Sequence, residues 1–373
     1  MRDVYISADN ILSPLGSDSA ENFGKLTNNL SGIKQHGNGA ISATPFYASL
    51  FENDFKILPG YTKFEQLLIG SIQDALAKSA VDKSDKKTIL IISSTKGNIS
   101  LLENESDSAS LRDRISLHTS AKKIAGYFGF LNTPIFISNA CISGILAMMT
   151  AMRLIQSGQY DHAVVAGADV ISKFVLSGFQ SFQAVSSEPC KPFDEARTGI
   201  SLGEGAATII FSSDKTYSSG IKISGGSVSN DANHISGPSR TGEELCQAIE
   251  KSMQQAEISA EDIDLVCAHG TATLFNDEME AKAFSLADLE KIPVNSLKGY
   301  YGHTLGAAGL IESVICIHSI KNSLLVPTLG FKKLGVSKPI NILQTLQQTT
   351  IKNCLKTASG FGGCNAAIII NQQ

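Results

Sequence analysis

The sequence predicts an α/β fold built on buried sheets. Short runs of apolar and β-branched residues recur along the 373 residues, and segments with helical spacing of apolar positions lie between them. Strands that alternate with helices in this way indicate βαβ units. Hydrophobic residues make up 43% of the chain, charged residues 18%, and there are 32 glycines. This composition is typical of a compact globular protein and not of a disordered or coiled-coil chain.

The elements follow from the local pattern. Segments that are short, apolar and closed by polar residues or glycine are predicted as buried strands. These are residues 87–94, 133–138, 162–168, 207–211, 265–268 and 367–370. Apolar positions at helical spacing predict helices at residues 64–79, 143–157, 241–256 and 307–321.

A polar stretch rich in glycine and serine covers residues 212–226 and divides the chain near its middle. The elements follow one another in a similar order on either side of it, which is compatible with a duplicated architecture. We therefore expect one unit at residues 1–211 and a second at residues 212–373.

Charge and hydropathy exclude several classes of function. The formal net charge is -4, with no basic excess of the kind that favours nucleic-acid binding. The first residues lack the apolar core of a signal peptide, and no apolar run approaches the roughly 20 residues that span a bilayer. We expect a soluble, cytoplasmic protein without membrane insertion and without a nucleic-acid partner.

The seven cysteines are scattered singly and form no Cys-x-x-Cys pair. This pattern argues against a disulfide framework and against a zinc site, so no metal is expected. Most of the cysteines are interpreted as small buried hydrophobic residues. Cys141 differs, because it lies in the run SNACISG at residues 138–144, between a predicted apolar strand and the predicted start of a helix.

A helix entrance favours a reactive thiol. Free backbone N–H groups and the positive end of the helix dipole are expected to lower the pKa of Cys141 and to aim its own N–H at a bound carbonyl. The same pattern also fits a buried cysteine that simply begins a core helix.

Two histidines in glycine-framed segments favour the reactive interpretation. His269 lies in the run AHGTAT and follows the predicted strand at 265–268, which places it at the carboxyl edge of a sheet, where active sites collect. His303 lies in the run KGYYGHTLGAAG and precedes a helix start of small residues. A single histidine in such a place is usually structural, but a cysteine and two histidines so placed indicate one shared site.

Together these segments resemble the β-ketoacyl-acyl carrier protein synthases, the elongating condensing enzymes of the thiolase superfamily. The resemblance covers nearly the whole chain and includes residues 13–16, 191–194, Arg197, 203–205, 360–363 and Asn365. It implies a thiolase-like, five-layered αβαβα fold of two similar halves, with the cysteine in the first and both histidines in the second. It also implies a homodimer, or a heterodimer with a related ketosynthase subunit.

The resemblance also implies a role for each reactive residue. Cys141 would accept an acyl group from an acyl carrier protein as a thioester. The Nε2 atoms of His269 and His303 would stabilise the enolate formed when a malonyl-carrier loses carbon dioxide. The backbone N–H groups of Cys141 and Phe361 would form the oxyanion hole. No cofactor is expected apart from the phosphopantetheine arm of the carrier.

Further positions match supporting residues of the family. Lys298 and Glu312 are expected to form a buried ion pair that orients the histidines. Thr271 and Thr273 match threonines that bind the pantetheine amides, although loop-capping hydroxyls explain them equally well. Phe361, between glycines, would swing as a gate, or would only plug the core.

Departures from the family pattern cluster around substrate recognition. Asn139 and Ile142 beside the cysteine, and Ser359 near the gate, are expected to contact the acyl substrate. The surface of the family that binds the carrier is normally basic, but here only Lys56 and Lys63 stand out.

Several alternatives follow from these departures. The enzyme could serve fatty acid synthesis or the synthesis of a polyketide or aryl-polyene chain. The chain could also be a non-catalytic partner subunit that resembles a chain-length factor. A degradative thiolase would use a second cysteine near the carboxyl terminus, but the setting of Cys364 matches the gating loop instead.

Overall fold

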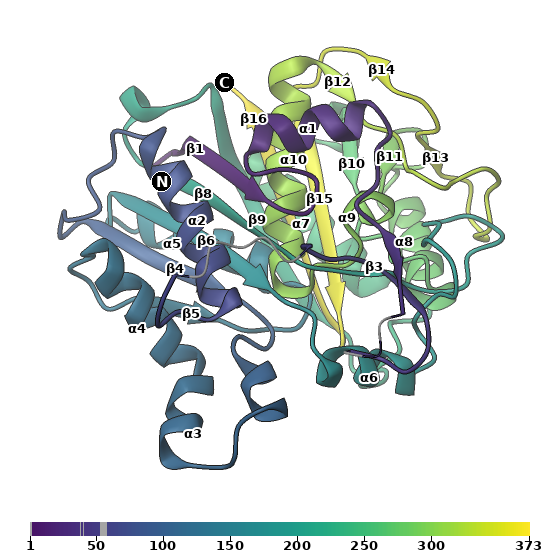
Figure 1. The fold of residues 1–373 in the computed structure, drawn as a ribbon. Helices are drawn as coiled ribbons and strands as arrows, with labels where there is room; N and C mark the ends of the chain where they lie inside the picture. The colour runs from purple at the N-terminus through teal and green to yellow at the C-terminus, as the bar shows by residue number, and fades with distance from the viewer. Residues whose placement is uncertain (1, 38, 40, 53–57) are drawn as a thin grey trace.

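The computed structural model describes residues 2–37, 39, 41–52 and 58–373. Its described strands are β1 (Val4–Leu12), β2 (Lys34–His36), β3 (Phe46–Ser49), β4 (Thr88–Ser93), β5 (Ile135–Ile137), β6 (His162–Asp169), β7 (Leu202–Gly203), β8 (Gly205–Ser212), β9 (Ile221–Asn230), β10 (Leu265–Cys267), β11 (Pro293–Asn295), β12 (Leu324–Leu325), β13 (Asn341–Ile342), β14 (Gln347–Gln348), β15 (Asn353–Gly360) and β16 (Cys364–Gln372). An 11-stranded mixed sheet in the order β13-β11-β10-β15-β16-β9-β1-β8-β6-β4-β5 crosses the molecule (Figure 1).

The large sheet contains the same strand arrangement twice. The first half runs β5-β4-β6-β8-β1 and the second runs β11-β10-β15-β16-β9. In each half three parallel strands are followed by two antiparallel pairings. The halves meet where β1 pairs with β9, antiparallel, over Val4–Ile6 and 221–223. The expected pair of similar halves is therefore confirmed.

The helices form the layers around the sheet halves. They are α1 (Ser19–Thr27), α2 (Lys63–Ala77), α3 (Ala109–Ile115), α4 (Leu117–Phe128), α5 (Ser143–Gln156), α6 (Lys173–Ser181), α7 (Glu243–Ala256), α8 (Leu274–Leu286), α9 (Lys298–Tyr301) and α10 (Ala308–Asn322), with short 3-10 turns η1 (Ile99–Glu103), η2 (Lys215–Tyr217), η3 (Ala260–Asp262) and η4 (Leu305–Ala307). Within the described ranges, no helix combines the length and the apolar character that crossing a membrane requires.

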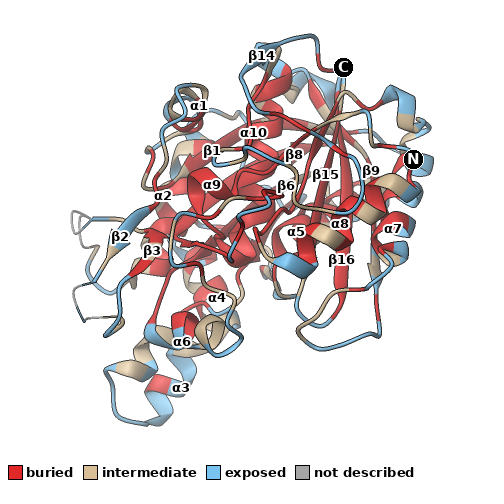
Figure 2. Cartoon of the chain, turned by 90° about the vertical axis from the view of Figure 1, so that its right-hand side faces the viewer, coloured by how far each residue is buried: buried red, intermediate tan, exposed pale blue. Residues whose placement is uncertain are grey.

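Three hydrophobic clusters define five layers. Helices α2 and α4 pack on the outer face of the first half-sheet, and α7 and α8 pack on the outer face of the second. Helices α5 and α10 lie between the two half-sheets in the largest cluster. Figure 2 shows α10 almost entirely in the buried colour, whereas the small helix α3 projects into solvent. The order αβαβα agrees with the fold expected from the resemblance.

The two central helices cross at glycines near their amino ends. A Cβ on Gly144 would lie 2.9 Å from the backbone N of Leu310, and a Cβ on Gly309 would lie 2.9 Å from the backbone N of Ile145. Only glycine permits this approach of two backbones. The residues just before α5 and α10 are thereby brought together.

Most predicted elements are confirmed. The predicted strands correspond to β4, β5, β6, β8, β10 and β16, and the predicted helices to α2, α5, α7 and α10. The interpretation of residues 212–226 as a divider is wrong in part, because β9 begins at Ile221. Gly225 in this stretch serves packing, because a Cβ there would lie 2.1 Å from the carbonyl oxygen of Ser252 on α7. The boundary after residue 211 stays a proposal, since β8 ends at Ser212.

Candidate active site

Cys141 lies on a sharp turn between β5 and α5. The preceding residue, Ala140, has a positive φ of 42°, an uncommon conformation for a residue with a side chain. Helix α5 starts only at Ser143, and the Cys141 side chain is buried. Burial raises the pKa of the thiol to about 12. The expected lowering of this pKa is therefore wrong, because burial outweighs the helix entrance, and the resting group is a neutral thiol.

His303 contacts the nucleophile directly. Its Nε2 lies 2.9 Å from Sγ of Cys141. The backbone of His303 is fixed against a neighbouring segment, because its N–H donates to Ser201 O at 2.7 Å and its carbonyl accepts from Gly203 N at 3.0 Å. Within the described residues Nδ1 of His303 has no hydrogen-bond partner. Either tautomer of this ring is therefore available, so Nε2 can accept or donate a proton.

His269 completes the group from the second half of the chain. Its ring meets that of His303 edge-on, with the ring centroids 5.1 Å apart. Sγ of Cys141 and one ring nitrogen of each histidine all lie within 4.8 Å of one another. Glu280 on α8 holds this segment, because it accepts the backbone N–H groups of His269 at 2.7 Å and Gly270 at 2.6 Å.

Both histidines are neutral at pH 7. Burial, followed by the charge of Lys298, lowers the pKa of His269 well below its ordinary value, and the same two causes act on His303. Nζ of Lys298 lies 3.5 Å from Nδ1 of His269. Because an ammonium group can only donate, Nδ1 of His269 accepts and its proton resides on Nε2. His269 therefore offers a neutral N–H donor.

A buried chain of charges stands behind His269. Lys298 donates a hydrogen bond to Oε1 of Glu312, so the expected ion pair is confirmed. Oε2 of Glu312 lies 2.7 Å from Nζ of Lys356, and all three side chains are buried. Sequence reasoning missed Lys356. The available signal was a lysine and a threonine inside the run NCLKTASG, where an ordinary buried strand would be apolar.

The loop after His269 is held by a second acidic residue that sequence reasoning missed. Asp277 accepts hydrogen bonds from the backbone N–H groups of Thr271 at 2.9 Å, Ala272 at 3.2 Å and Phe193 at 2.7 Å. Asp277 and Glu280 are three residues apart on α8 and so share one helix face. That spacing, soon after the first histidine segment, was the signal that could have found them.

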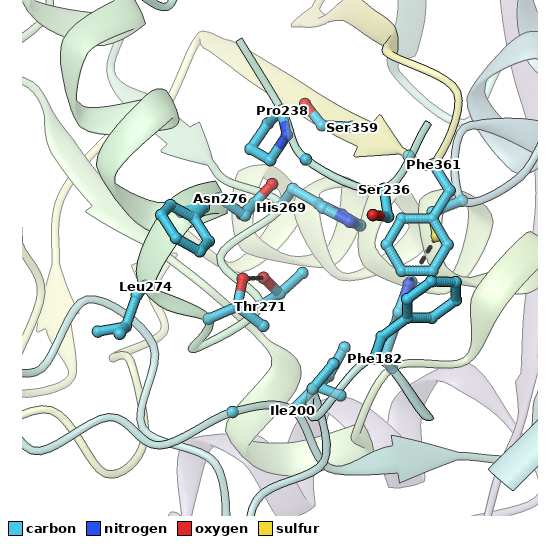
Figure 3. Close-up of a pocket in the computed structure, with 18 of the residues that line it drawn as sticks. Phe182, Ile200, Ser236, Pro238, His269, Thr271, Leu274, Asn276, Ser359 and Phe361 are labelled. Carbon is cyan, nitrogen blue, oxygen red and sulfur yellow. Dashed lines mark hydrogen bonds between the residues drawn. The ribbon is translucent and has the colours of Figure 1, made fainter. Parts of the chain in front are cut away.

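A cavity of about 450 Å³ opens onto Cys141 and both histidines. Figure 3 shows His269 and Thr271 on its wall, with Phe182 and Phe361 side by side. Thr271, Thr273 and Ser359 line the cavity as expected, and the hydroxyls of the two threonines lie 2.9 Å apart. The two other candidates for substrate contact are not among the lining residues: Asn139 is exposed to solvent, and Ile142 is buried in the core.

Aromatic side chains surround the entrance to Cys141. The Phe361 ring stacks on Phe179 at 5.7 Å and meets Phe182 edge-on at 5.3 Å. A Cβ on Gly360 would lie 2.9 Å from the backbone N of Cys141, so the loop that carries Phe361 packs directly on the nucleophile. The two phenylalanines of the α6 segment gave no signal in the sequence pattern.

Comparison with known families agrees with this site. Residues 1–216 match the family described as beta-ketoacyl synthase, N-terminal domain, and residues 221–332 match beta-ketoacyl synthase, C-terminal domain. The chain belongs to the beta-ketoacyl synthase family. The members of this family are condensing enzymes of the acyltransferase type.

Individual relatives extend the comparison. This ketosynthase chain is 26% identical to a putative mitochondrial 3-oxoacyl-[acyl-carrier-protein] synthase of Schizosaccharomyces pombe, over 99% of this chain and 98% of that one. It is 31% identical to 3-oxoacyl-[acyl-carrier-protein] synthase 2 of Rhizobium meliloti, over 63% of this chain and 60% of that protein.

Solved structures share the fold. A beta-ketoacyl synthase from Burkholderia phymatum superposes with a TM-score of 0.90 at 23% identity and full coverage of both chains. A ketosynthase in complex with its chain length factor, from Xenorhabdus doucetiae, gives 0.87 at 24% identity, over 100% of this chain and 98% of that one. The thiolase-like fold of the ketosynthases is therefore confirmed.

Two basic positions, Lys56 and Lys63, stood out in the sequence at the surface that would meet a carrier. Lys56 lies outside the described residues. Nζ of Lys63, at the start of α2, lies 2.6 Å from Oε2 of buried Glu204. Lys63 thus pairs with a buried carboxylate, while 40% of its own side chain stays exposed to solvent.

Proposed function

We propose that the chain is an active β-ketoacyl synthase that joins an acyl group held on Cys141 to a malonyl group delivered by an acyl carrier protein. One observation carries this proposal. Sγ of Cys141 lies 2.9 Å from Nε2 of His303, and neutral His269 faces the same cavity. A thiol with a proton acceptor, beside a neutral N–H donor, suits acyl transfer followed by enolate stabilisation.

Acyl transfer comes first. Because burial raises the pKa of Cys141 to about 12, the thiolate is not present at rest. As Sγ attacks the thioester carbonyl, Nε2 of His303 accepts the thiol proton. The carbon–sulfur bond to the pantetheine breaks, and the proton returns to the departing thiolate. The backbone N–H groups of Cys141 and Phe361 would stabilise the oxyanion.

Condensation follows when a malonyl-carrier replaces the first carrier. Loss of carbon dioxide leaves an enolate, whose oxygen would accept hydrogen bonds from Nε2 of His269 and His303. The enolate carbon attacks the acyl carbonyl on Cys141 and expels the sulfur as a thiolate, which takes up one proton from solvent. The product is a β-ketoacyl-carrier longer by two carbons. Thr271 and Thr273 line the cavity, and their hydroxyls would bind the amides of the phosphopantetheine arm.

The partner and acyl group are proposed from relatives. One similar structure is a type II polyketide acyl-carrier protein in complex with its ketosynthase, and others pair a ketosynthase with a chain length factor. We therefore propose an acyl carrier protein as the substrate carrier, and a homodimer or a heterodimer with a related subunit. The relatives serve both fatty acid and polyketide synthesis, so the acyl chain is saturated or of the polyketide or aryl-polyene type.

Intact-mass measurement tests the function. The protein is incubated with purified carriers that bear saturated, polyketide or aryl-polyene chains, and malonyl-carrier is then added. We expect an acyl adduct on Cys141, release of carbon dioxide and a carrier-bound β-ketoacyl product. Cys364→Ala serves as the control and should retain the adduct. Absence of both adduct and carbon dioxide would overturn the proposal.

A second candidate function is a non-catalytic partner that resembles a chain-length factor. Similar solved structures that pair a ketosynthase with a chain length factor motivate it. The discriminating experiment mixes this chain with a cognate ketosynthase. Condensation that survives Cys141→Ala in this chain would support the partner role, and its loss would support catalysis.

A further inference from the structure

Lys356 on β15 lies in a cage of oxygen atoms inside the protein. Its Nζ lies 2.7 Å from the carbonyl oxygen of Thr357 and 2.7 Å from Oε2 of Glu312. It also lies 3.2 Å from each of the carbonyl oxygens of Cys267 and Ala268. The side chain is fully buried. The three hydrogen bonds of the ammonium group all go to backbone carbonyl oxygens, and Glu312 adds an ion pair.

This cage connects to His269 by two routes. The two backbone carbonyls at 3.2 Å belong to the residues that immediately precede His269. Through the other route, Lys356 binds one oxygen of Glu312, whose second oxygen binds Lys298. Lys298 in turn donates to the carbonyl oxygen of His269 at 3.0 Å and approaches its Nδ1 at 3.5 Å. Displacing Lys356 would therefore disturb both the backbone and the tautomer of His269.

Lys356 also balances the charge of this region. Glu280 lies on the other side of the same strand ends and accepts hydrogen bonds from donors only: the backbone N–H groups of His269 and Gly270, Nδ2 of Asn276 and Oγ1 of Thr357. Burial raises the pKa of Glu280, but this set of donors favours the carboxylate. Lys298 and Lys356 then offset Glu312 and Glu280. Without Lys356, one buried negative charge would remain uncompensated.

Other titratable groups lie near His269. Arg197 and Asp277 are both buried, with Nε 3.7 Å from Oδ2, and burial raises the pKa of Asp277 to about 7. Burial keeps the thiol of Cys141 and the ring of His303 neutral at pH 7. The positive charge of Lys356 therefore lies behind His269, the N–H donor proposed to face the negative charge of the enolate.

We propose that Lys356 is a positioning residue for the condensation step: its ammonium group neutralises the carboxylates behind His269 and holds Lys298 in place against that ring. This inference rests on the proposed condensing function. Lys356 is not among the residues that line the cavity, and it acts through Glu312, Lys298 and the backbone before His269. It should therefore matter more when the enolate forms than when Cys141 is acylated.

Two substitutions separate charge from hydrogen bonding. Lys356→Met keeps the length but removes charge and donors, and Lys356→Gln keeps donors without the charge. In both we expect Cys141 acylation to stay within about threefold of wild type. Carbon dioxide release from malonyl-carrier should fall on the order of 10–100-fold, as for other residues that support a catalytic ligand. The control is Lys321→Met, on α10, whose lysine pairs with Asp9 at 3.5 Å outside the site.

The pH profile of carbon dioxide release gives a readout that a purely structural role would not move. The charge of Lys356 lowers the pKa of both histidines. Removing this charge should raise both pKa values, so the acidic limb of the profile should shift to higher pH in both variants. Ethylammonium added to Lys356→Ala should restore release, whereas tetramethylammonium, which cannot donate a hydrogen bond, should not.

The outcomes distinguish this inference from the proposed function. If wild-type protein releases no carbon dioxide, the proposed function fails. If wild type is active and folded Lys356 variants release carbon dioxide at the wild-type rate with an unshifted pH profile, only the role of Lys356 is overturned. Equal losses in acylation and release would also overturn it. Should Lys356→Met fail to fold, Lys356→Gln and the rescue by ethylammonium decide the question in the same way.

Discussion

At the scale of single residues, the two histidines are not equivalent. His303 contacts Sγ of Cys141 at 2.9 Å, whereas His269 is fixed by Lys298 as an N–H donor. We expect His269→Ala to retain acylation and to lose carbon dioxide release by roughly 10²–10³-fold, the cost of one oxyanion donor. His303→Ala should slow both steps. Single-turnover measurement of each step checks this, and equal effects of the two substitutions on acylation would contradict it.

The sequence identified Cys141 and both histidines because glycines and small residues frame them. It did not predict the pKa values of these residues. The low pKa expected for Cys141 was based only on its predicted place at the start of a helix. The pKa is instead raised, because segments far apart in the chain bury the thiol. Lys356 was missed for the same reason, since the oxygens around it come mainly from β10 and α10, not from its own strand.

At the scale of elements, the turn between β15 and β16 depends on two adjacent glycines with different surroundings. Both have positive φ, 88° at Gly362 and 75° at Gly363. A Cβ on Gly363 would lie 2.2 Å from the carbonyl oxygen of Asp231, whereas one on Gly362 would meet nothing within 4 Å. Gly362→Ala should cost about 1–2 kcal/mol of unfolding free energy for its backbone conformation. Gly363→Ala should cost a further ~1–3 kcal/mol for the clash.

Denaturant unfolding of the two variants measures this difference, and condensation assays extend it to function. Because the turn carries Phe361, Gly363→Ala should also lose more activity than Gly362→Ala. Equal stability of the two variants would show that Asp231 can move aside.

The contact between β1 and α10 predicts a dependence of stability on acid. Asp9 on β1 lies 2.9 Å from Nε2 of His318 and 3.5 Å from Nζ of Lys321. Burial alone would raise the pKa of Asp9, but His318 and Lys321 outweigh it and lower the pKa from 3.8 to about 2. The resulting stabilisation, about 2 kcal/mol, is present above pH 3.8 and is lost as the pH falls towards 2. Unfolding free energies measured from pH 5 to 2 should show this loss in wild type and a smaller one in Asp9→Asn.

Helices and strands with a regular pattern of apolar residues were predicted correctly. A strand that mixes polar and apolar residues was not. The α5 and α10 segments are apolar over most of their length because they are buried between two sheets. β15 carries Lys356, Thr357 and Ser359, whose polar atoms bind neighbouring segments, so its sequence does not have the apolar pattern of a buried strand. A strand is missed by sequence patterns when its polar side chains find their hydrogen-bond partners on segments far away in the sequence.

At the scale of the whole molecule, the site exists only where the halves meet. The first half supplies Cys141 before α5, and the second supplies His269 after β10 and His303 before α10. Helices α5 and α10 belong to one hydrophobic cluster drawn from both halves, and their glycine crossing brings the reactive residues together. Neither half can bury its central helix without the other.

A chain cut between Ser213 and Asp214, after β8 ends, should therefore behave as two interdependent fragments. We expect neither fragment alone to unfold cooperatively, because each would expose one face of α5 or α10 to water. Mixing the fragments should restore a cooperative transition and acylation of Cys141. Calorimetry and intact-mass measurement follow the two effects, and Cys141→Ala in the first fragment controls for the site of acylation. A first fragment that unfolds cooperatively by itself would mean that the half-sheet and its outer helices suffice for folding, and the central layer would then serve the active site alone.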